Sequence, residues 1–266
     1  SRGNTSPTVI LPNGFNMLVP VTDPHNNHPY TYQPGTDLSL AHIDVTHQAS
    51  PWQNAYGSWQ FMVNSSLDPT ARLTGAQVGA VGRKAAFSHE NETAGAHYYG
   101  VTFDEDPDSP ASGVKLEVTP TEHAAMARFT FPADASYRNL IFDCDFADGG
   151  LALSEDGRSF TAYSDHVKDG STRMYVYGVF SSAFETGQVI GGKQGIVGFG
   201  AGEGQVSLKL ATSFISYDQA KKNLELEIGE KETFDDVYKR AQKTWDDLLG
   251  IIEIEGATEE QATTFY

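Results

Sequence analysis

The sequence predicts a mainly β protein, an antiparallel β-sandwich (supersandwich) followed by a short helical linker. Short apolar or alternating runs recur between turn signals from about residue 8 to residue 215. After Ser213 the apolar residues change to helical spacing. The chain has 266 residues, of which 39% are hydrophobic, enough to build one large core.

Each of the clearest expected strands is a run of five to seven residues, alternating or continuously apolar, and turns rich in Asp, Gly and Pro separate the runs. The clearest runs are 58–63, 98–103, 114–119, 127–131, 174–180 and 206–212. Many short strands at this spacing are typical of an antiparallel sandwich. The glycines between residues 187 and 204 are expected to mark turns and bulges. They do not form a phosphate-binding loop, because Gln194 follows Gly192 and Lys193.

The last fifty residues predict helices. Ser216 with Gln219 fits a capping box and Gly229 a C-terminal cap, so we expect a helix over 217–228. A second helix, capped by Thr233 and ended by Gly250, would carry an apolar stripe for core packing. The stripe consists of Phe234, Val237, Tyr238, Ala241, Trp245 and Leu248.

Residues 251–255 alternate as a short strand would, and Thr258 with Gln261 fits a further capping box. The helix opened at Thr258 has barely begun where the sequence stops, so we expect an N-terminal part of a longer protein. The predicted organisation is a β-sandwich over 1–215 and a helical linker over 216–266.

Composition excludes two classes of partner. A net charge of −17 repels nucleic acid and acidic membranes, and no apolar run approaches the ~20 residues that span a bilayer. A neutral substrate or a locally bound divalent cation is compatible with this charge. The single cysteine, Cys144, lies in an apolar run and is expected to be a core residue.

Residues 46–52, THQASPW, combine an imidazole, an amide, hydroxyls and an indole in seven positions. An indole can stack on the apolar face of a sugar ring while polar groups bond its hydroxyls. His47 and Trp52 are therefore candidates for sugar contacts. The alternative is a surface loop with one buried tryptophan.

Four groups of titratable residues have the composition of a metal or acid–base site. The groups around His25 and His42 lack a third, distant ligand, so we expect solvated loops there. The group at Asp143 lacks the glycine and terminal Glu of an EF-hand. The groups are Asp23, His25 and His28; His42, Asp44 and His47; Asp143, Asp145 and Asp148; and His89, Glu90 and Glu92.

Several segments, in order along the chain, resemble glycoside hydrolase family 92, the exo-acting, calcium-dependent α-mannosidases. The family's opening turn is similar to residues 3–7 and 11–16, its T-H-x-P-S-P-W block to 46–52, and its F-[SR]-H-x-N-E…H-Y-Y block to 87–99. Its link to a second domain is similar to 210–216, 220–224 and 245–266. The resemblance implies that His89, Glu90 and Glu92 belong to a structural turn.

The sequence departs from the family pattern near the expected sugar site. Asn13 stands where the family has Phe, Ala49 replaces a proline, and Asn54 and Ala55 replace a closing Gly-Asp. The lost aspartate removes a charged hydrogen-bond acceptor near the expected sugar site. This departure allows a linkage preference, or even an activity, that differs from the family's.

The resemblance implies a β-sandwich domain and a missing second domain, an α/α toroid. It implies an inverting α-mannosidase whose catalytic carboxylates and calcium ligands lie outside this chain, so no catalytic residue or metal ligand is assigned here. Gly14, Phe15, His47 and Trp52 would supply one wall of the mannose pocket. The fragment alone would be inactive.

The resemblance further implies a secreted or cell-surface protein that acts on α-mannosides or N-glycan mannose; no signal peptide is visible at the N-terminus. Two other interpretations remain open: a stand-alone carbohydrate-binding module, and a structural interaction domain that has lost its site. The sequence does not indicate which linkage is preferred.

Overall fold

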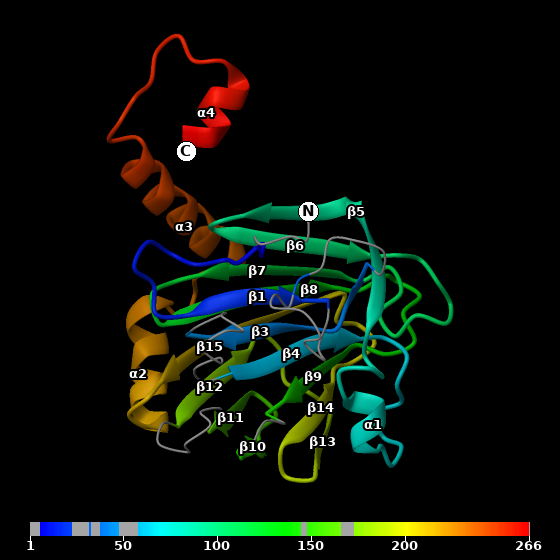
Figure 1. The fold of residues 1–266 in the computed structure, drawn as a ribbon. Coiled ribbons are helices and arrows are strands. Elements are labelled where there is room, and N and C mark those ends of the chain that lie inside the picture. Colours follow the sequence, from blue (N-terminus) through cyan, green and yellow to red (C-terminus); the bar gives the residue numbers. More distant parts are fainter. Residues whose placement is uncertain are drawn as a thin grey trace.

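The computed structural model describes residues 6–22, 32, 38–47, 58–144, 148–165 and 173–265. Over these residues two antiparallel sheets pack face to face, and helices follow the last strand (Figure 1). The fold is therefore the mainly β sandwich followed by helices that the sequence predicts.

The smaller sheet has six strands, in the order β1-β3-β4-β9-β14-β13, and every neighbouring pair is antiparallel. Its strands are β1 (Met17–Val21), β3 (His42–Thr46), β4 (Ser58–Asn64), β9 (Asn139–Asp143), β14 (Gln194–Gly198) and β13 (Thr186–Ile190).

The larger sheet has nine strands, in the order β10-β11-β12-β15-β8-β7-β6-β5-β2. Its strands are β10 (Gly149–Leu153), β11 (Ser159–Ser164), β12 (Met174–Phe180), β15 (Gln205–Ser213), β8 (Ala124–Thr130), β7 (Lys115–Pro120), β6 (Tyr98–Phe103), β5 (Ala85–Gly95) and β2 (Ser39–Leu40). The six runs expected from the sequence correspond to β4, β6, β7, β8, β12 and β15.

The core lies between the sheets and is rich in aromatic side chains. Trp59 and Phe142 of the smaller sheet stack with Phe160 of the larger, with ring centroids 4.7–5.4 Å apart. All three are fully buried. Cys144 is buried in the same cluster, as expected for a core residue.

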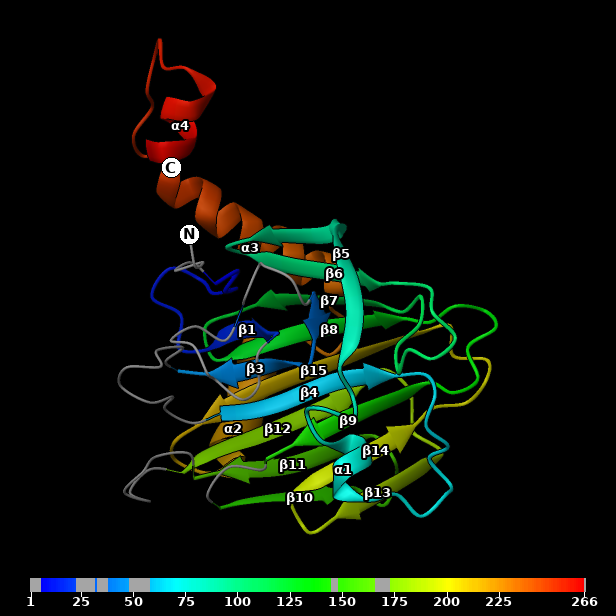
Figure 2. The ribbon, with the colours of Figure 1, turned by 45° about the vertical axis from the view of Figure 1, so that its right-hand side comes forward.

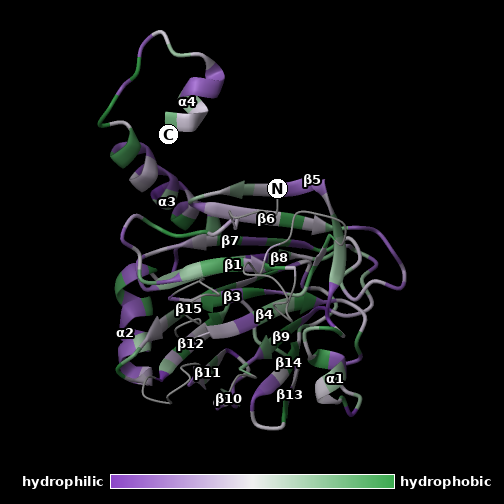
Figure 3. Cartoon of the chain, in the orientation of Figure 1, coloured by the Kyte–Doolittle hydropathy of each residue, from purple (hydrophilic) through white to green (hydrophobic). Residues whose placement is uncertain are grey.

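The helices are α1 (Gly75–Val78), α2 (Tyr217–Glu227), α3 (Phe234–Leu249) and α4 (Glu259–Phe265). The Ser216 side chain accepts from the Gln219 backbone, and Thr233 forms a capping box with Asp236. Leu224 of α2 and Val237 of α3 pack on the outer face of the larger sheet. The rest of α2 is largely hydrophilic (Figure 3). None of the helices in the described ranges is long and apolar enough to cross a membrane.

The strand expected over 251–255 is wrong. The chain turns after α3, where the Ile252 amide donates to the Leu249 carbonyl at 3.4 Å, and Ile251 is 75% exposed. The end of α3 and α4 project away from the sandwich in both ribbon views (Figures 1 and 2), so no strand of the described ranges lies beside this segment. An alternating pattern forms a strand only where a partner strand is available. The division into domains at residue 215 stays a prediction.

A buried arginine holds α1 on the outer face of the smaller sheet. Arg83 is fully buried and donates to the Ala41 and Val78 carbonyls at 3.0 and 3.1 Å. Its guanidinium also reaches three side chains of the sheet: Asp143 at 2.8 Å, Gln60 at 2.6 Å and His42 at 3.1 Å. Because a guanidinium only donates, His42 Nδ1 accepts, and burial together with Arg83 keeps the His42 pKa well below its ordinary value.

We predict that Arg83→Met destabilises the fold by about 3 kcal/mol or more, since it leaves the buried Asp143 carboxylate without its cation. Urea unfolding followed by tryptophan fluorescence measures the loss. Arg72→Met is the matched control, because Arg72 is exposed and should change stability by less than about 0.5 kcal/mol. Equal stabilities of the two variants would contradict a stabilising role for this network.

Candidate functional site

The first turn is shaped by Asn13 and Gly14. The Gly14 amide donates to the Leu11 carbonyl at 2.8 Å, and a Cβ at Gly14 would lie 3.0 Å from that oxygen. Asn13 has a φ of 60°, a left-handed conformation that asparagine tolerates better than most side chains. The departure from the family's Phe at this position therefore suits the turn.

Phe15 and Asn16 are fixed by segments distant in sequence. The Phe15 amide donates to the Glu122 carbonyl at 2.8 Å, and Asn16 Nδ2 donates to the His123 carbonyl at 2.7 Å. Asn16 Oδ1 accepts from the Thr212 hydroxyl at 2.7 Å, so the turn is tied to both β15 and the hairpin between β7 and β8. Asn16 is fully buried, which makes these bonds important for the position of Phe15.

His47 follows β3 and packs against Phe15. Its Nδ1 lies 2.6 Å from the Phe15 carbonyl oxygen, and because a carbonyl only accepts, Nδ1 carries the proton. Burial lowers the pKa of His47 to about 4, against the opposing effect of the Phe15 hydrogen bond. The ring is therefore neutral at pH 7, and its Nε2 is an acceptor.

The His47 Nε2 atom is withdrawn from solvent and has no hydrogen-bond partner among the described residues. In this tautomer, Nε2 would act toward a sugar hydroxyl as a hydrogen-bond acceptor and not as a donor. Whether His47 touches a sugar stays a prediction. Trp52 lies outside the described residues, as do Ala49, Asn54 and Ala55.

The structure brings Gly14, Phe15 and His47 together and adds two residues that the sequence analysis did not place here. The Phe214 ring lies 4.3 Å from that of His47, and the His123 ring lies 5.0 Å from that of Phe15, measured between centroids. Phe214 lies in the segment 210–216 that resembles the family, so the resemblance could have indicated it as a candidate residue. His123 belongs to no motif, and only the tertiary fold places it beside Phe15.

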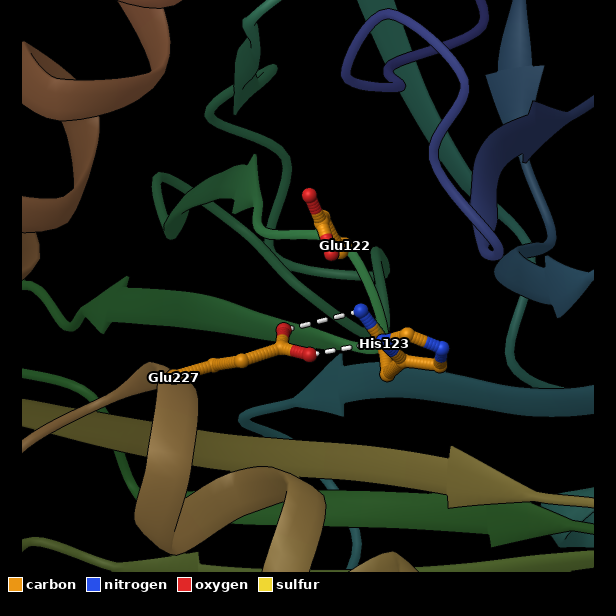
Figure 4. Close-up of side chains that lie close together, drawn as sticks. All are labelled: Glu122, His123 and Glu227. Atoms are coloured by element: carbon orange, nitrogen blue, oxygen red, sulfur yellow. Dashed lines mark hydrogen bonds and ion pairs between the residues drawn. The ribbon is translucent and has the colours of Figure 1, made fainter.

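His123 sits in the turn between β7 and β8, which α2 supports through Glu227 (Figure 4). One Glu227 oxygen lies 2.7 Å from His123 Nδ1. The other accepts from the Thr121 hydroxyl at 2.6 Å and from the His123 and Ala124 amides at 2.8 and 3.1 Å. The carboxylate thus forms hydrogen bonds with three residues of this turn.

Glu122, His123 and Glu227 lie close enough that their ligand atoms fall within 4.8 Å of one another. Calcium takes 6–8 oxygen ligands, whereas Glu227 already accepts four hydrogen bonds within the turn. These three residues therefore do not fit a calcium site. Where the calcium ligands of the full-length protein lie stays a prediction.

The block 87–92 is not a turn, and that expectation was wrong. It lies in β5, where the register with β6 shifts between Phe87 and Glu92. The bulge lets Glu92 accept from the Tyr32 and Tyr99 hydroxyls at 2.8 Å, with His89 Nδ1 also 2.8 Å away. The carboxylate thus joins the strand to the buried Tyr32, a role in packing rather than in proton transfer.

In the other candidate clusters, the described residues face different partners and do not form one site. His42 faces Arg83, and Asp44 accepts from Ser58, whereas His47 faces Phe15. Burial raises the Asp44 pKa to about 7, although Ser58 and Arg83 oppose the shift. Asp143 pairs with Arg83, while Asp148 accepts from the Gly149 amide. Asp23, His25, His28 and Asp145 lie outside the described residues.

Comparison with known proteins identifies the family. The model of the glycosyl hydrolase family 92 N-terminal domain matches residues 1–229, and that of the family 92 catalytic domain matches residues 219–266. An uncharacterized secreted glycosidase of Arthroderma benhamiae is 29% identical, over 54% of this chain and 24% of the relative.

Two solved structures from Bacteroides thetaiotaomicron share the fold. A family 92 inverting mannosidase superposes with a TM-score of 0.83 at 23% identity, covering 99% of this chain and 36% of its own. A family 92 α-mannosidase superposes with a TM-score of 0.76 at 20% identity, covering 100% of this chain and 38% of its own.

This chain therefore spans about a quarter of the length of the fungal relative and little more than a third of each bacterial protein. The match to the N-terminal domain covers most of the sequence, and the catalytic-domain match begins within α2. The chain belongs to glycosyl hydrolase family 92 and contains its N-terminal domain.

Proposed function

We propose that the full-length protein is an exo-acting, inverting, calcium-dependent α-mannosidase and that this chain forms one wall of its mannose pocket. The observation that carries the proposal is the ordered match of two family 92 domains. The similar solved structures, both mannosidases by name, support the choice of sugar. The substrates would be α-mannosides or the mannose of N-glycans.

The wall would consist of Gly14, Phe15, His47 and Trp52. Gly14 keeps the first turn narrow, and Phe15 offers an aromatic ring for contact with the apolar face of a sugar. His47 packs directly on Phe15 and is neutral at pH 7, so it supports that ring without placing a charge beside a neutral substrate. Trp52 would stack on the mannose or on the leaving group.

The catalytic carboxylates and the calcium ligands would come from the second domain. Inversion needs two carboxyl groups roughly 6.5–9.5 Å apart, with room for water between them. Calcium bound there would supply a cation that helps distort the mannose ring. The isolated chain would be inactive. We also propose a secreted or cell-surface location, since the fungal relative is described as secreted.

We predict that the full-length protein hydrolyses an aryl α-mannoside, that EDTA abolishes the activity, and that added calcium restores it. Proton NMR of the first product should show β-mannose, because inversion converts the α-anomer to the β-anomer. Residues 1–266 alone should show no turnover. Hydrolysis that yields α-mannose, or no hydrolysis of any α-mannoside tested, would contradict the proposal.

We predict that Trp52→Ala in the full-length protein raises KM for an α-linked mannobiose by about tenfold or more, since burying an aromatic side chain against a ligand contributes about 1.5–3 kcal/mol. Michaelis–Menten kinetics on the disaccharide measures the change. Unchanged kinetics would favour the structural interpretation of the THQASPW segment.

We predict that His47 makes the fold less stable as the pH falls from 6.5 to 4. Its folded pKa of about 4 lies below the ordinary 6.5, so within this window the unfolded chain binds a proton that the folded chain excludes. Protonation therefore favours unfolding.

Urea unfolding of wild type and His47→Leu at several pH values tests this expectation. The stability difference between them should change by on the order of 2 kcal/mol between pH 6.5 and 4, and should be constant from pH 7 to 8, where both states are neutral. Parallel stability curves across the whole range would show that His47 titrates normally.

A further inference from the structure

We propose that His123 is a further sugar-contact residue of the mannose pocket and that Glu227 is the residue that positions it. The inference rests on the proposed function and deepens it. It adds a residue from the hairpin between β7 and β8 to a wall so far assigned to the first turn and the THQASPW segment.

Glu227 fixes both the backbone and the imidazole of His123. One carboxylate oxygen lies 2.7 Å from Nδ1, and the other accepts from the His123 amide at 2.8 Å. In the neutral ring, a carboxylate that faces Nδ1 selects the tautomer protonated at that atom and leaves Nε2 as an acceptor. No described residue forms a hydrogen bond with the His123 Nε2 atom.

The position of His123 joins it to the proposed wall. Its ring centroid lies 5.0 Å from that of Phe15, and its own carbonyl accepts from Asn16 Nδ2 at 2.7 Å. The preceding residue, Glu122, accepts the Phe15 amide through its carbonyl at 2.8 Å. The hairpin and the first turn are therefore one hydrogen-bonded unit.

The imidazoles of His47 and His123 differ in their exposure to solvent. The His47 Nε2 atom is withdrawn from solvent, whereas the His123 side chain is 39% exposed. Of the two, His123 is the one that can accept a hydrogen bond from a ligand without a rearrangement of the wall.

Glu122 offers a second acceptor beside His123. Its side chain is exposed, and among the described residues none donates to its carboxylate. A ligand atom of each lies within 4.8 Å of the other. The Nε2 atom of His123 and the Glu122 carboxylate belong to the same turn, and each can accept a hydrogen bond from a different hydroxyl group of a sugar.

The test uses the full-length protein and a pair of isosteric variants. In His123→Asn, the side-chain amide can still donate to Glu227 from the place of Nδ1, but nothing stands at Nε2. In His123→Gln, a carbonyl oxygen can occupy the Nε2 position. We expect His123→Asn to lower kcat/KM by about 3- to 10-fold, the effect of losing one hydrogen bond, and His123→Gln to recover part of that loss.

Two substrates locate the contact. A loss with both an aryl α-mannoside and an α-linked mannobiose assigns the contact to a hydroxyl of the mannose itself; a loss with mannobiose alone assigns it to the leaving sugar. Unchanged kcat/KM with both substrates overturns the inference. Equal losses in both variants with a lowered melting temperature also overturn it, because they indicate a purely structural role.

Glu227→Gln tests the positioning, with Glu225→Gln on the exposed part of the same helix as the control. Nitrogen-15 NMR of the imidazoles should show His123 protonated at Nδ1 in wild type and in the control, and a mixture of tautomers in Glu227→Gln. The same tautomer in all three proteins would show that Glu227 does not set it. A wild type without activity on any α-mannoside is a different result, because it overturns the proposed function first.

Discussion

The packing of the two sheets around one aromatic core is the constraint on which the rest of this structure depends. Trp59, Phe142 and Phe160 come from three strands and stack with ring centroids 4.7–5.4 Å apart. Rings of this size bury a large apolar area, and their contact fixes the distance and the angle between the sheets. Once the sheets are set, the hairpin between β7 and β8, the end of β15 and the turn before β1 meet at the same end of the sandwich.

The core sets the approximate positions of these segments, and hydrogen bonds between them fix those positions more closely. The bond from Thr212 to Asn16 joins residues 196 positions apart, and the contact of Glu227 with His123 joins residues 104 apart. Such bonds contribute only about 1 kcal/mol each, but a buried amide left without its partners would cost more. The cost of leaving Asn16 or the hairpin unsatisfied is therefore what holds Phe15 in one orientation.

The sequence predicts the elements of this fold better than its site. Strands such as β12 show the alternation that one buried face produces. Thr233 and Thr258 are capping residues that predict the start of α3 and α4. The segment 251–255 misleads, because its alternation says nothing about whether a sheet edge is near. Block 87–92 misleads for another reason: a β-bulge leaves no clear mark in sequence. The sequence does not predict the position of His123, because that position depends on Glu227, which lies 104 residues away along the chain.

Helix α2 makes two sets of contacts with the sandwich, and a division of the chain at residue 215 would remove both. Ala220 and Leu224 bury its apolar face on the larger sheet, while its last residue, Glu227, supports the hairpin beside Phe15. The N-terminal-domain match runs to residue 229 and so includes the whole helix. A fragment ending at residue 215 would keep all the described strands yet remove the carboxylate that accepts from the His123 amide. Helix α2 is thus continuous in sequence with the segment that follows it, and its contacts join it to the larger sheet and to the hairpin between β7 and β8.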